Sequence, residues 1–384
     1  MSDDTFAETS SQSIFGRLGD AIKGVLFGII VIPFCIVLLF WNEGRAVKTA
    51  ASLKEGVAVV VSVAADAVQP SNEGKLVHVS GEATTVDIVR DPMFAVSQNA
   101  IRLTRTVEMF QWKEEAKSET AKKLGGGTET KTTYNYNKTW ADKLIPSSGF
   151  KLAAEHTNPA AMMAETLVTV AGKVTLGKFN LPPDIIGKMQ GDQTLVLTDA
   201  EVAKLPAELK AKVKCVGEAF YVGADPVTPA IGDQRVKFTV LKPATFSILA
   251  RQSGQTLDVY QTKAGRVIER VESGNVPAAA MFQHAASENK MLTWGLRIGG
   301  MLVMALGIGL ILRPLSTLAD VVPLLGDMIG VGTAFAALVV AAVTSTVIIA
   351  VAWFAVRPIL SVVLIAVAIG VVVLGKKIAG RKTA

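Results

Sequence analysis

The sequence predicts an α+β fold, with a β-rich extracytoplasmic domain inserted between one N-terminal and three C-terminal transmembrane helices. Two observations support this fold class. Of the 384 residues, 50% are hydrophobic and 19% are charged, and the charges are spread unevenly. Residues 24–42 contain no Asp, Glu, Lys or Arg, and residues 298–375 contain four of them. The rest of the chain is about 24% charged, as in soluble domains, and shows the alternation of strands. A purely cytosolic enzyme and a carrier built wholly in the bilayer are both excluded.

The first membrane helix is expected over residues 24–42, which are enough apolar residues to cross a bilayer. A cytoplasmic arm, residues 1–23, precedes it. No small-residue cleavage site follows the apolar run, so it is interpreted as an uncleaved signal anchor. Pro33 is expected to kink the helix because it removes one backbone hydrogen bond.

The C-terminal apolar region divides at its charges into three further helices, over residues 294–312, 328–356 and 358–375. Residues 313–327 are too short to span and are predicted to lie at the cytoplasmic interface. Arg357 precedes Pro358, a pair that favours a tight turn between the last two helices.

The orientation follows from the basic tail, residues 376–384, whose four Lys and Arg residues predict a cytoplasmic C-terminus. Four crossings return the N-terminus to the same side and leave residues 43–293 outside the cytoplasm. Trp41, Trp294 and Trp353 then mark helix ends on one membrane face, a pattern typical of interfacial aromatic belts.

The extracytoplasmic segment, residues 43–293, is large enough for its own core. Alternating or β-branched runs predict strands over 56–64, 75–89, 101–112, 130–140, 193–198, 235–241, 245–251 and 256–262. Helices are expected over 183–189, 199–213 and 278–292, with Pro206 interrupting the second. The segment Glu114–Lys131, which is rich in Lys and Glu and contains three consecutive glycines, is predicted to be an exposed hairpin loop.

Charged residues at the helix ends are the candidate structural residues. Asn42, Glu43 and Arg45 follow the first helix and Arg297 lies near the start of the second, so we expect an ion pair between Glu43 and Arg297 that joins the domain to the helices.

Asp320 and Asp327 could mark an ion or proton path. The stronger alternative is structural, with Asp327 capping the third helix and Asp320 on a solvated face.

Small residues recur at a spacing of four, which places each pair on one helix face where backbones can approach closely. The pairs are Gly295 and Gly299, Gly332 and Ala336, Ala337 and Ala341, and Ala366 and Gly370. They predict packing within one bundle, contact between protomers, or both.

Motifs for catalysis or cofactor binding are absent from the sequence. His78, His156 and His284 lie far apart without a metal-ligand spacing, and the two cysteines, Cys35 and Cys215, predict no disulfide. A phosphate-loop-like stretch at 370–377 lacks the required Ser or Thr. We therefore expect no catalytic residue, cofactor or metal. The net charge of +6 is diffuse outside the tail, which favours contact with anionic lipid over nucleic acid.

An ordered series of segments resembles the transmembrane protein 43 family, also called LUMA. They are WNEGRA (41–46), SNEGKLVHVSG (71–81), DPMFAV (91–96), RTVEMFQW (105–112), TYNYNKTW (133–140), HTNPAAM (156–162), ILARQSG (248–254), KMLTWGLR (290–297) and ADVVPLLGD (319–327). The resemblance implies one N-terminal and three C-terminal membrane helices around a lumenal domain. It also implies residence in the endoplasmic reticulum and inner nuclear membrane for animal members, self-association and scaffolding of membrane proteins. No catalytic residues are established for the family. The Ala-, Val- and Gly-rich composition indicates a bacterial member, whose domain would be periplasmic in the inner membrane.

The function expected first is that of a non-enzymatic membrane scaffold that forms homo-oligomers and collects lipids or other membrane proteins. An oligomeric channel or transport component that uses the C-terminal helices is the alternative. An enzyme acting on lipid or on the cell envelope is the third possibility.

Overall fold

Three long helices form one layer of the molecule. The computed structural model describes residues 4–356, and its long helices are α1 (Ile14–Val59), α5 (Ala278–Ala319) and α6 (Pro323–Val356). All three are long and apolar enough to cross a membrane. The predicted spans 24–42, 294–312 and 328–356 lie within them, whereas the predicted helix 358–375 lies outside the described residues. The mixed helix and sheet architecture predicted from the sequence is confirmed.

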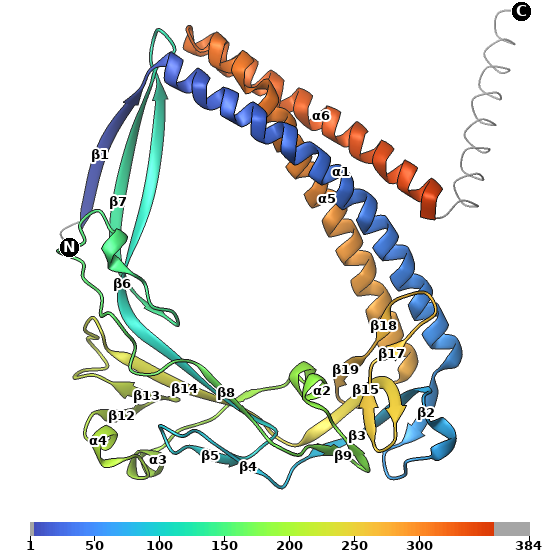
Figure 1. Cartoon of the computed structure of the whole chain (residues 1–384). Coiled ribbons are helices and arrows are strands. Elements are labelled where there is room, and N and C mark those ends of the chain that lie inside the picture. The colour runs from blue at the N-terminus through green and yellow to red at the C-terminus, as the bar shows by residue number, and fades with distance from the viewer. Residues whose placement is uncertain (1–3, 357–384) are drawn as a thin grey trace, which may run out of the picture.

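The helices are longer than the predicted spans because α1 and α5 continue beyond the apolar segments as a packed pair that reaches the β domain (Figure 1). Pro33 lies inside α1 without ending it. Residues 313–319 continue α5, and only a short turn separates them from α6, so the predicted interfacial segment is not a separate element. The expected strand over 56–64 is half helix, since α1 runs to Val59 and only β2 (Val61–Ala64) is extended.

An eight-stranded sheet forms one layer of the β domain, with the order β1-β7-β6-β14-β13-β12, while β8 pairs with β6 and β11 with β14. The strands are β1 (Thr5–Gln12), β6 (Arg102–Lys122), β7 (Thr128–Ala141), β8 (Leu167–Val170), β11 (Gln193–Thr194), β12 (Val213–Val216), β13 (Ala219–Val222) and β14 (Gln234–Leu241).

A seven-stranded sheet forms the second layer, with the order β19-β15-β16-β10-β9-β3-β2 and a further pairing of β15 with β3. Its strands after β2 are β3 (Leu76–Thr84), β9 (Thr175–Leu176), β10 (Phe179–Asn180), β15 (Ala244–Ser253), β16 (Thr256–Asp258) and β19 (Arg270–Ser273). The remaining strands form two separate two-stranded antiparallel sheets. One consists of β4 (Ile88–Arg90) and β5 (Ser97–Asn99), and the other of β17 (Tyr260–Gln261) and β18 (Val267–Ile268).

The main core lies where the two sheets meet. It joins Val77 of β3 and Phe246 of β15 to Val107 of β6 and Phe238 of β14. Between Arg102 and Trp112 every second residue of β6 is buried, as expected for a half-buried strand. Three short helices pack beside the core, namely α2 (Pro183–Lys188), α3 (Asp199–Ala203) and α4 (Ala207–Lys210). The helix predicted over 199–213 is thus divided at Pro206, as expected, but ends before β12.

The exposed hairpin predicted over Glu114–Lys131 is confirmed, but its loop is limited to residues 123–127, because the other residues belong to two strands. The distal half of β6 (113–122) and the facing part of β7 (128–137) continue as a hairpin, and β1 pairs with β7 from Thr5 with Asn135 to Gln12 with Thr128. We call these three strand segments the arm. At about 3.3 Å per residue, the 21 residues of β6 extend roughly 70 Å. Residues 5–12 therefore belong to a sheet of the β domain, and the side of the membrane on which they lie stays a prediction.

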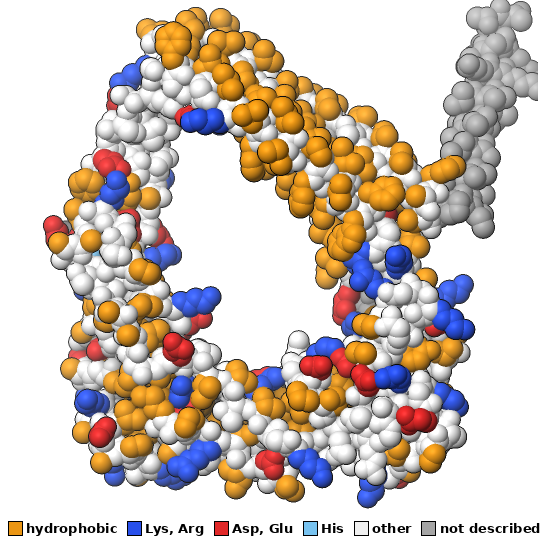
Figure 2. Space-filling view, viewed as in Figure 1, with side chains coloured by type: hydrophobic (Ala, Val, Ile, Leu, Met, Phe, Trp, Pro, Cys, Tyr) orange, Lys and Arg blue, Asp and Glu red, His pale blue; other side chains and the backbone are white. Residues whose placement is uncertain are grey.

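The molecule is a closed frame with an opening in its middle (Figure 1). The arm leaves the β domain on one side, the helices leave it on the other, and the two meet at the start of α1. Figure 2 shows the opening in the space-filling view and shows hydrophobic side chains covering the helices. The helix layer is therefore fastened to the β domain at both of its ends.

Candidate functional site at the two ends of the helix layer

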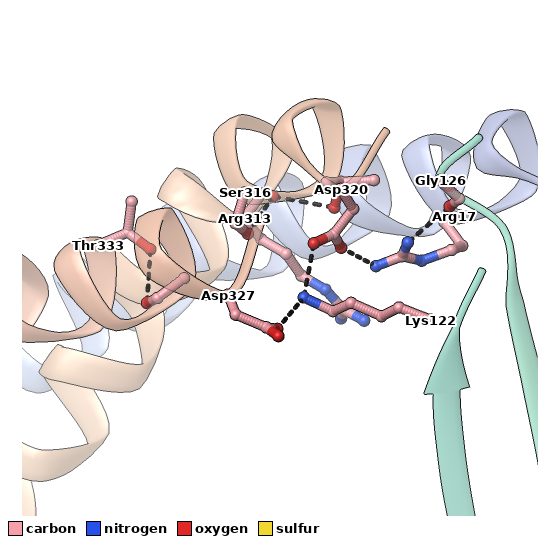
Figure 3. A network of polar contacts seen from close by, with 10 residues as sticks. Arg17, Lys122, Gly126, Arg313, Ser316, Asp320, Asp327 and Thr333 are labelled. Atoms are coloured by element: carbon pink, nitrogen blue, oxygen red, sulfur yellow. Dashed lines mark hydrogen bonds and ion pairs between the residues drawn. The ribbon is translucent and has the colours of Figure 1, made fainter. Parts of the chain in front are cut away.

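A cluster of four charged residues joins the arm tip to the helices (Figure 3). We call Arg17, Lys122, Asp320 and Asp327 the distal cluster. The Lys122 ammonium lies 2.5 Å from one Asp320 carboxylate oxygen and 2.7 Å from Asp327, and Arg17 forms an ion pair with the other oxygen of Asp320. These residues come from α1, β6, the end of α5 and α6, so one cluster fixes four elements.

Backbone contacts seat the arm tip against the helices. Arg17 also donates to the Gly126 carbonyl at 2.6 Å, and the Gly125 N–H donates to the Val321 carbonyl at 3.2 Å. Gly126 has a positive φ of 80°, and a Cβ there would lie 2.5 Å from the Ile14 side chain. Glycine is therefore required at the point where the turn of the arm touches α1.

Asp320 is the buried centre of the distal cluster, with 2% of the residue exposed. Its predicted place on a solvated face is wrong, because the two helices and the arm enclose it. Burial acts to raise its pKa, but hydrogen bonds from Lys122 and Arg17 outweigh burial, so the pKa lies below the ordinary 3.8. Burial likewise acts to lower the pKa of Lys122, but its bonds to Asp320 and Asp327 raise it above 10.5.

Asp327 is not the cap predicted from the sequence. Helix α6 begins at Pro323, so Asp327 lies in the second turn, and its side chain reaches Lys122. Both carboxylates bind cationic side chains, and the ion or proton path that was the other expectation for Asp320 and Asp327 stays a prediction.

The opposite cluster, which we call the proximal cluster, contains Glu43, Arg45, Arg297 and Trp353. The predicted ion pair is confirmed, since Arg297 donates through two nitrogens to the two Glu43 oxygens at 2.7 Å each. The Trp353 indole N–H donates to Glu43 at 2.7 Å. Glu43 is 1% exposed, and this fully desolvated carboxylate joins α1, α5 and α6.

Polar and aromatic neighbours hold the proximal cluster in place. The Arg297 guanidinium lies 4.8 Å from the ring centre of Trp294 and 5.7 Å from that of Trp353. Asn42 donates to the Thr293 carbonyl at 3.1 Å, and Arg45 donates to the Thr293 hydroxyl at 2.8 Å. Trp41 is on the same stretch of α1 with a half-exposed ring. Most residues predicted at this boundary therefore act together. Arg357 lies outside the described residues.

Close contacts between α1 and α5 involve glycines that the sequence did not single out. A Cβ on Gly28 would lie 2.5 Å from the Gly307 carbonyl oxygen, and one on Gly300 would lie 2.8 Å from Leu39. By contrast, a Cβ on Gly295, Gly299 or Gly332 would meet no atom within 4 Å. Within residues 4–356 these three glycines therefore have no close packing partner, and their packing within a bundle that includes residues 358–375 stays a prediction.

The other predicted small residues also include both buried and exposed positions. Ala337 and Ala341 are buried, whereas Gly332 and Ala336 are exposed on α6. Ala366 and Gly370 lie outside the described residues.

A charged cleft between α5, α2 and β19 is the main alternative site. Its lining includes Lys188, Glu269, Arg270, Glu272 and Glu288. Arg270 donates to both Glu288 oxygens, at 2.9 and 2.8 Å, and Lys188 pairs with Glu269. Both cations of this cleft are thus paired with carboxylates, as in a structural ion-pair network. No group of three or more His, Cys, Asp or Glu that could hold a metal occurs among residues 4–356.

The geometry defines a class of protein, a multi-pass membrane protein whose apolar helices are fastened at both ends to a β-rich domain. The chain belongs to the transmembrane protein 43 family, whose family pattern matches residues 109–358.

The relatives of this chain cover most of its length. It is 34% identical to transmembrane protein 43 of Homo sapiens over 363 residues, which cover 91% of this chain and 89% of the human protein. The protein of that name in Mus musculus is 34% identical over 353 residues, which cover 89% and 86%. A homolog in Drosophila melanogaster is 30% identical over 305 residues, which cover 78% and 79%. No solved structure matches the chain.

Proposed function

We propose that this protein is a membrane scaffold that associates with copies of itself and organises lipids or other membrane proteins without catalysing a reaction. The observation that carries the proposal is the closed frame. The distal cluster joins the helices to the arm, and the proximal cluster joins the three helices to one another. Since Leu76 and Leu249 of the β domain also pack against Met281 and Phe282 of α5, the helices and the domain form one stiff unit. A stiff protein with one apolar layer can hold its surfaces in fixed positions for binding partners. It is less suited to a function that requires a cycle of conformational changes.

Surface features of the helices support self-association. Gly295 and Gly299 on α5, and Gly332 and Ala336 on α6, are exposed with four-residue spacing. Such small-residue faces let helices of different chains approach closely in lipid. The self-association and scaffolding that the family resemblance implies are part of this proposal, together with a bacterial inner membrane location and a periplasmic β domain.

The test is the assembly state in native membranes. Chemical cross-linking of intact membranes, followed by extraction in mild detergent and single-particle imaging, should show a defined homo-oligomer. A strictly monomeric protein in both membranes and detergent would overturn the proposal.

A channel or transport component is the second candidate, and one observation favours it. The arm carries charged side chains alongside apolar helices, across an opening that runs through the frame (Figure 2). Ion flux into liposomes that contain the purified protein tests this function. Flux equal to that of empty liposomes would exclude it, and unchanged flux in the Asp320→Ala/Asp327→Ala variant would exclude only these two residues from conduction.

A further inference from the structure

The arm reaches from the β domain to the distal end of the membrane helices. Its tip contacts Arg17 of α1, while the β domain contacts the end of α1 that follows Glu43, through a hydrogen bond between Ser52 and Thr262. The 26 residues from Arg17 to Glu43 extend about 39 Å along the helix, at 1.5 Å per residue. A bilayer with its headgroup regions is roughly 40–45 Å thick. The distal and proximal clusters are therefore separated by the distance between two membrane surfaces.

The helices between these clusters lack a polar face. Residues 24–42 carry no charge, and the exposed side chains of this part of α1 include Leu26, Phe27, Ile30, Phe34 and Val37. A helix lying along the membrane surface needs a strongly polar side, so this one crosses the hydrocarbon. The arm starts at the distal end of α1 and runs back toward the β domain on the other side of the opening, so the part of the arm next to its tip lies within the same range of depth (Figure 1).

The arm is unsuited to contact with lipid. One of its faces carries Lys113, Glu115, Lys117 and Glu119, each with more than half of its side chain exposed. Charged side chains and open sheet edges are not tolerated against hydrocarbon, but are tolerated when protein or water covers them. Among residues 4–356 of one copy, no strand pairs with either outer edge of the arm.

The register shows which backbone groups are open. The Trp112 N–H donates to the Asn158 side chain, on the side of β6 opposite β7. Backbone groups alternate in direction along a strand, so the N–H and C=O groups of the even-numbered residues from 114 to 120 point away from β7. Residues 113–122 pair with β7 alone, which leaves these groups without a strand partner. The Tyr136 N–H donates to the Asp4 carbonyl, so the odd-numbered residues of β1 face outward.

These two edges match each other. Each presents four outward residues, Glu114, Ala116, Ser118 and Thr120 on β6 and Thr5, Ala7, Thr9 and Ser11 on β1. Strand β1 contains no Lys, Pro or bulge, the features by which proteins block an edge from pairing. Within one copy, β1 and β6 both run toward the tip. Copies that share one membrane orientation are related by rotation about the membrane normal, so β1 of one copy is parallel to β6 of the next.

We propose that β1 of one copy pairs in parallel with the distal half of β6 of the next copy, so that the arms join into one continuous sheet inside a ring of membrane helices. This inference rests on the proposed self-association and names the surface responsible. It covers both open edges, and the helices then separate the polar arms from lipid. Residues 5–12 run through the membrane depth beside β7 in this arrangement, and only the residues between β1 and the start of the apolar run lie at the tip.

Disulfide mapping in native membranes tests the pairing. In a Cys35→Ala/Cys215→Ser background, Thr9→Cys is combined in turn with Glu115→Cys, Lys117→Cys or Glu119→Cys, whose side chains share one sheet face with residue 9. Within one chain Thr9 and Glu119 are two strands apart, about 10 Å, which is too far for a disulfide. Mild oxidation should therefore give covalently linked oligomers at one of the three positions and little at the other two.

A proline pair supplies a matched control. Ala116→Pro removes an N–H that points outward, so it should preserve the hairpin and reduce linked oligomers about ten-fold. Lys117→Pro removes an N–H directed at β7 and should disrupt the arm itself. The directly paired residues Ala7 and Thr133, both changed to Cys, should form an intrachain disulfide wherever the arm is folded.

The outcomes separate this inference from the proposed function. One outcome is that oligomers form, that no disulfide links residue 9 to β6, and that Ala116→Pro does not change them. Self-association would then occur through the helices, and only the arm pairing would be overturned. A heterologous protein linked to residue 9 would also overturn it. A monomer in native membranes would overturn both proposals.

Discussion

Glu43 shows at the level of a single residue how the helices are held together. Its carboxylate receives hydrogen bonds from Arg297 and Trp353 and has almost no contact with solvent. The partnership of Glu43 and Arg297 could be predicted because both residues lie at one helix boundary. The hydrogen bond from Trp353 to Glu43 could not be predicted in this way, because Trp353 lies 310 residues further along the chain and reaches Glu43 only when the helices pack together.

We expect Glu43→Gln to destabilise the protein by about 3 kcal/mol, because it leaves the Arg297 guanidinium desolvated without its counter-charge. Thermal unfolding in detergent, followed by intrinsic tryptophan fluorescence, measures the loss. Glu218→Gln, at an exposed position, is the control. The exchange Glu43→Arg/Arg297→Glu should recover part of the stability, and a double variant no better than either single variant would contradict a direct pair.

The distal cluster should respond to acid. Since the pKa of Asp320 is lowered, its contribution to stability is complete above pH 3.8 and is lost as the pH falls below that value. Lys122 has a raised pKa, so its contribution persists up to pH 10.5 and is lost only above it. We expect the arm tip to separate from the helices at acidic pH. Spin labels on Lys123→Cys and Leu324→Cys measure this distance.

A variant with the acid response removed is the control for that experiment. Asp320→Asn should give the longer distance at neutral pH as well, since the amide does not attract Lys122 and Arg17 as an ion. A label distance that is short at pH 7 in Asp320→Asn and unchanged in acid would show that the cluster does not hold the tip.

At the scale of elements, the contact between α1 and α5 depends on two glycines. A Cβ on Gly28 would meet the carbonyl oxygen of Gly307, which belongs to the backbone and cannot turn aside. We expect Gly28→Leu to cost about 2–3 kcal/mol through overpacking. Gly295→Ala, where nothing lies within 4 Å, should be nearly neutral in the same detergent unfolding assay. Equal effects of the two changes would refute this packing.

The arm illustrates why part of the fold escaped prediction. Up to Trp112, β6 alternates buried and half-buried residues, and the buried Leu103, Val107 and Met109 supply the apolar period that predicts a strand. From Lys113 onward both faces of the ribbon are polar, so the period of two no longer appears in the hydrophobicity. The extended conformation there is maintained by pairing with β7 and β1, contacts between residues more than 100 positions apart in the case of β1.

At the scale of the whole molecule, the closed frame predicts different solvent contact for the arm and the helices. We expect Lys117→Cys in native membranes to react with a membrane-impermeant, water-soluble maleimide, because this side chain is exposed and the opening beside the arm is expected to contain water. Ile30→Cys on the exposed apolar side of α1 should react at least about ten-fold more slowly, since thiolate formation requires water. Comparable rates at the two positions would contradict the arrangement.

The sequence by itself determined the apolar helices, the β-rich domain between them and the family, because hydrophobic length, alternation and ordered motifs are local properties of the chain. It also indicated Glu43 and Arg297. Only the tertiary structure decided that Asp320 is buried, that Gly28 meets Gly307 and that residues 5–12 extend a sheet of the domain. Each of these depends on segments far apart in sequence. Their charges and backbone groups acquire partners only when the frame closes, and a pattern of single residues does not contain that information.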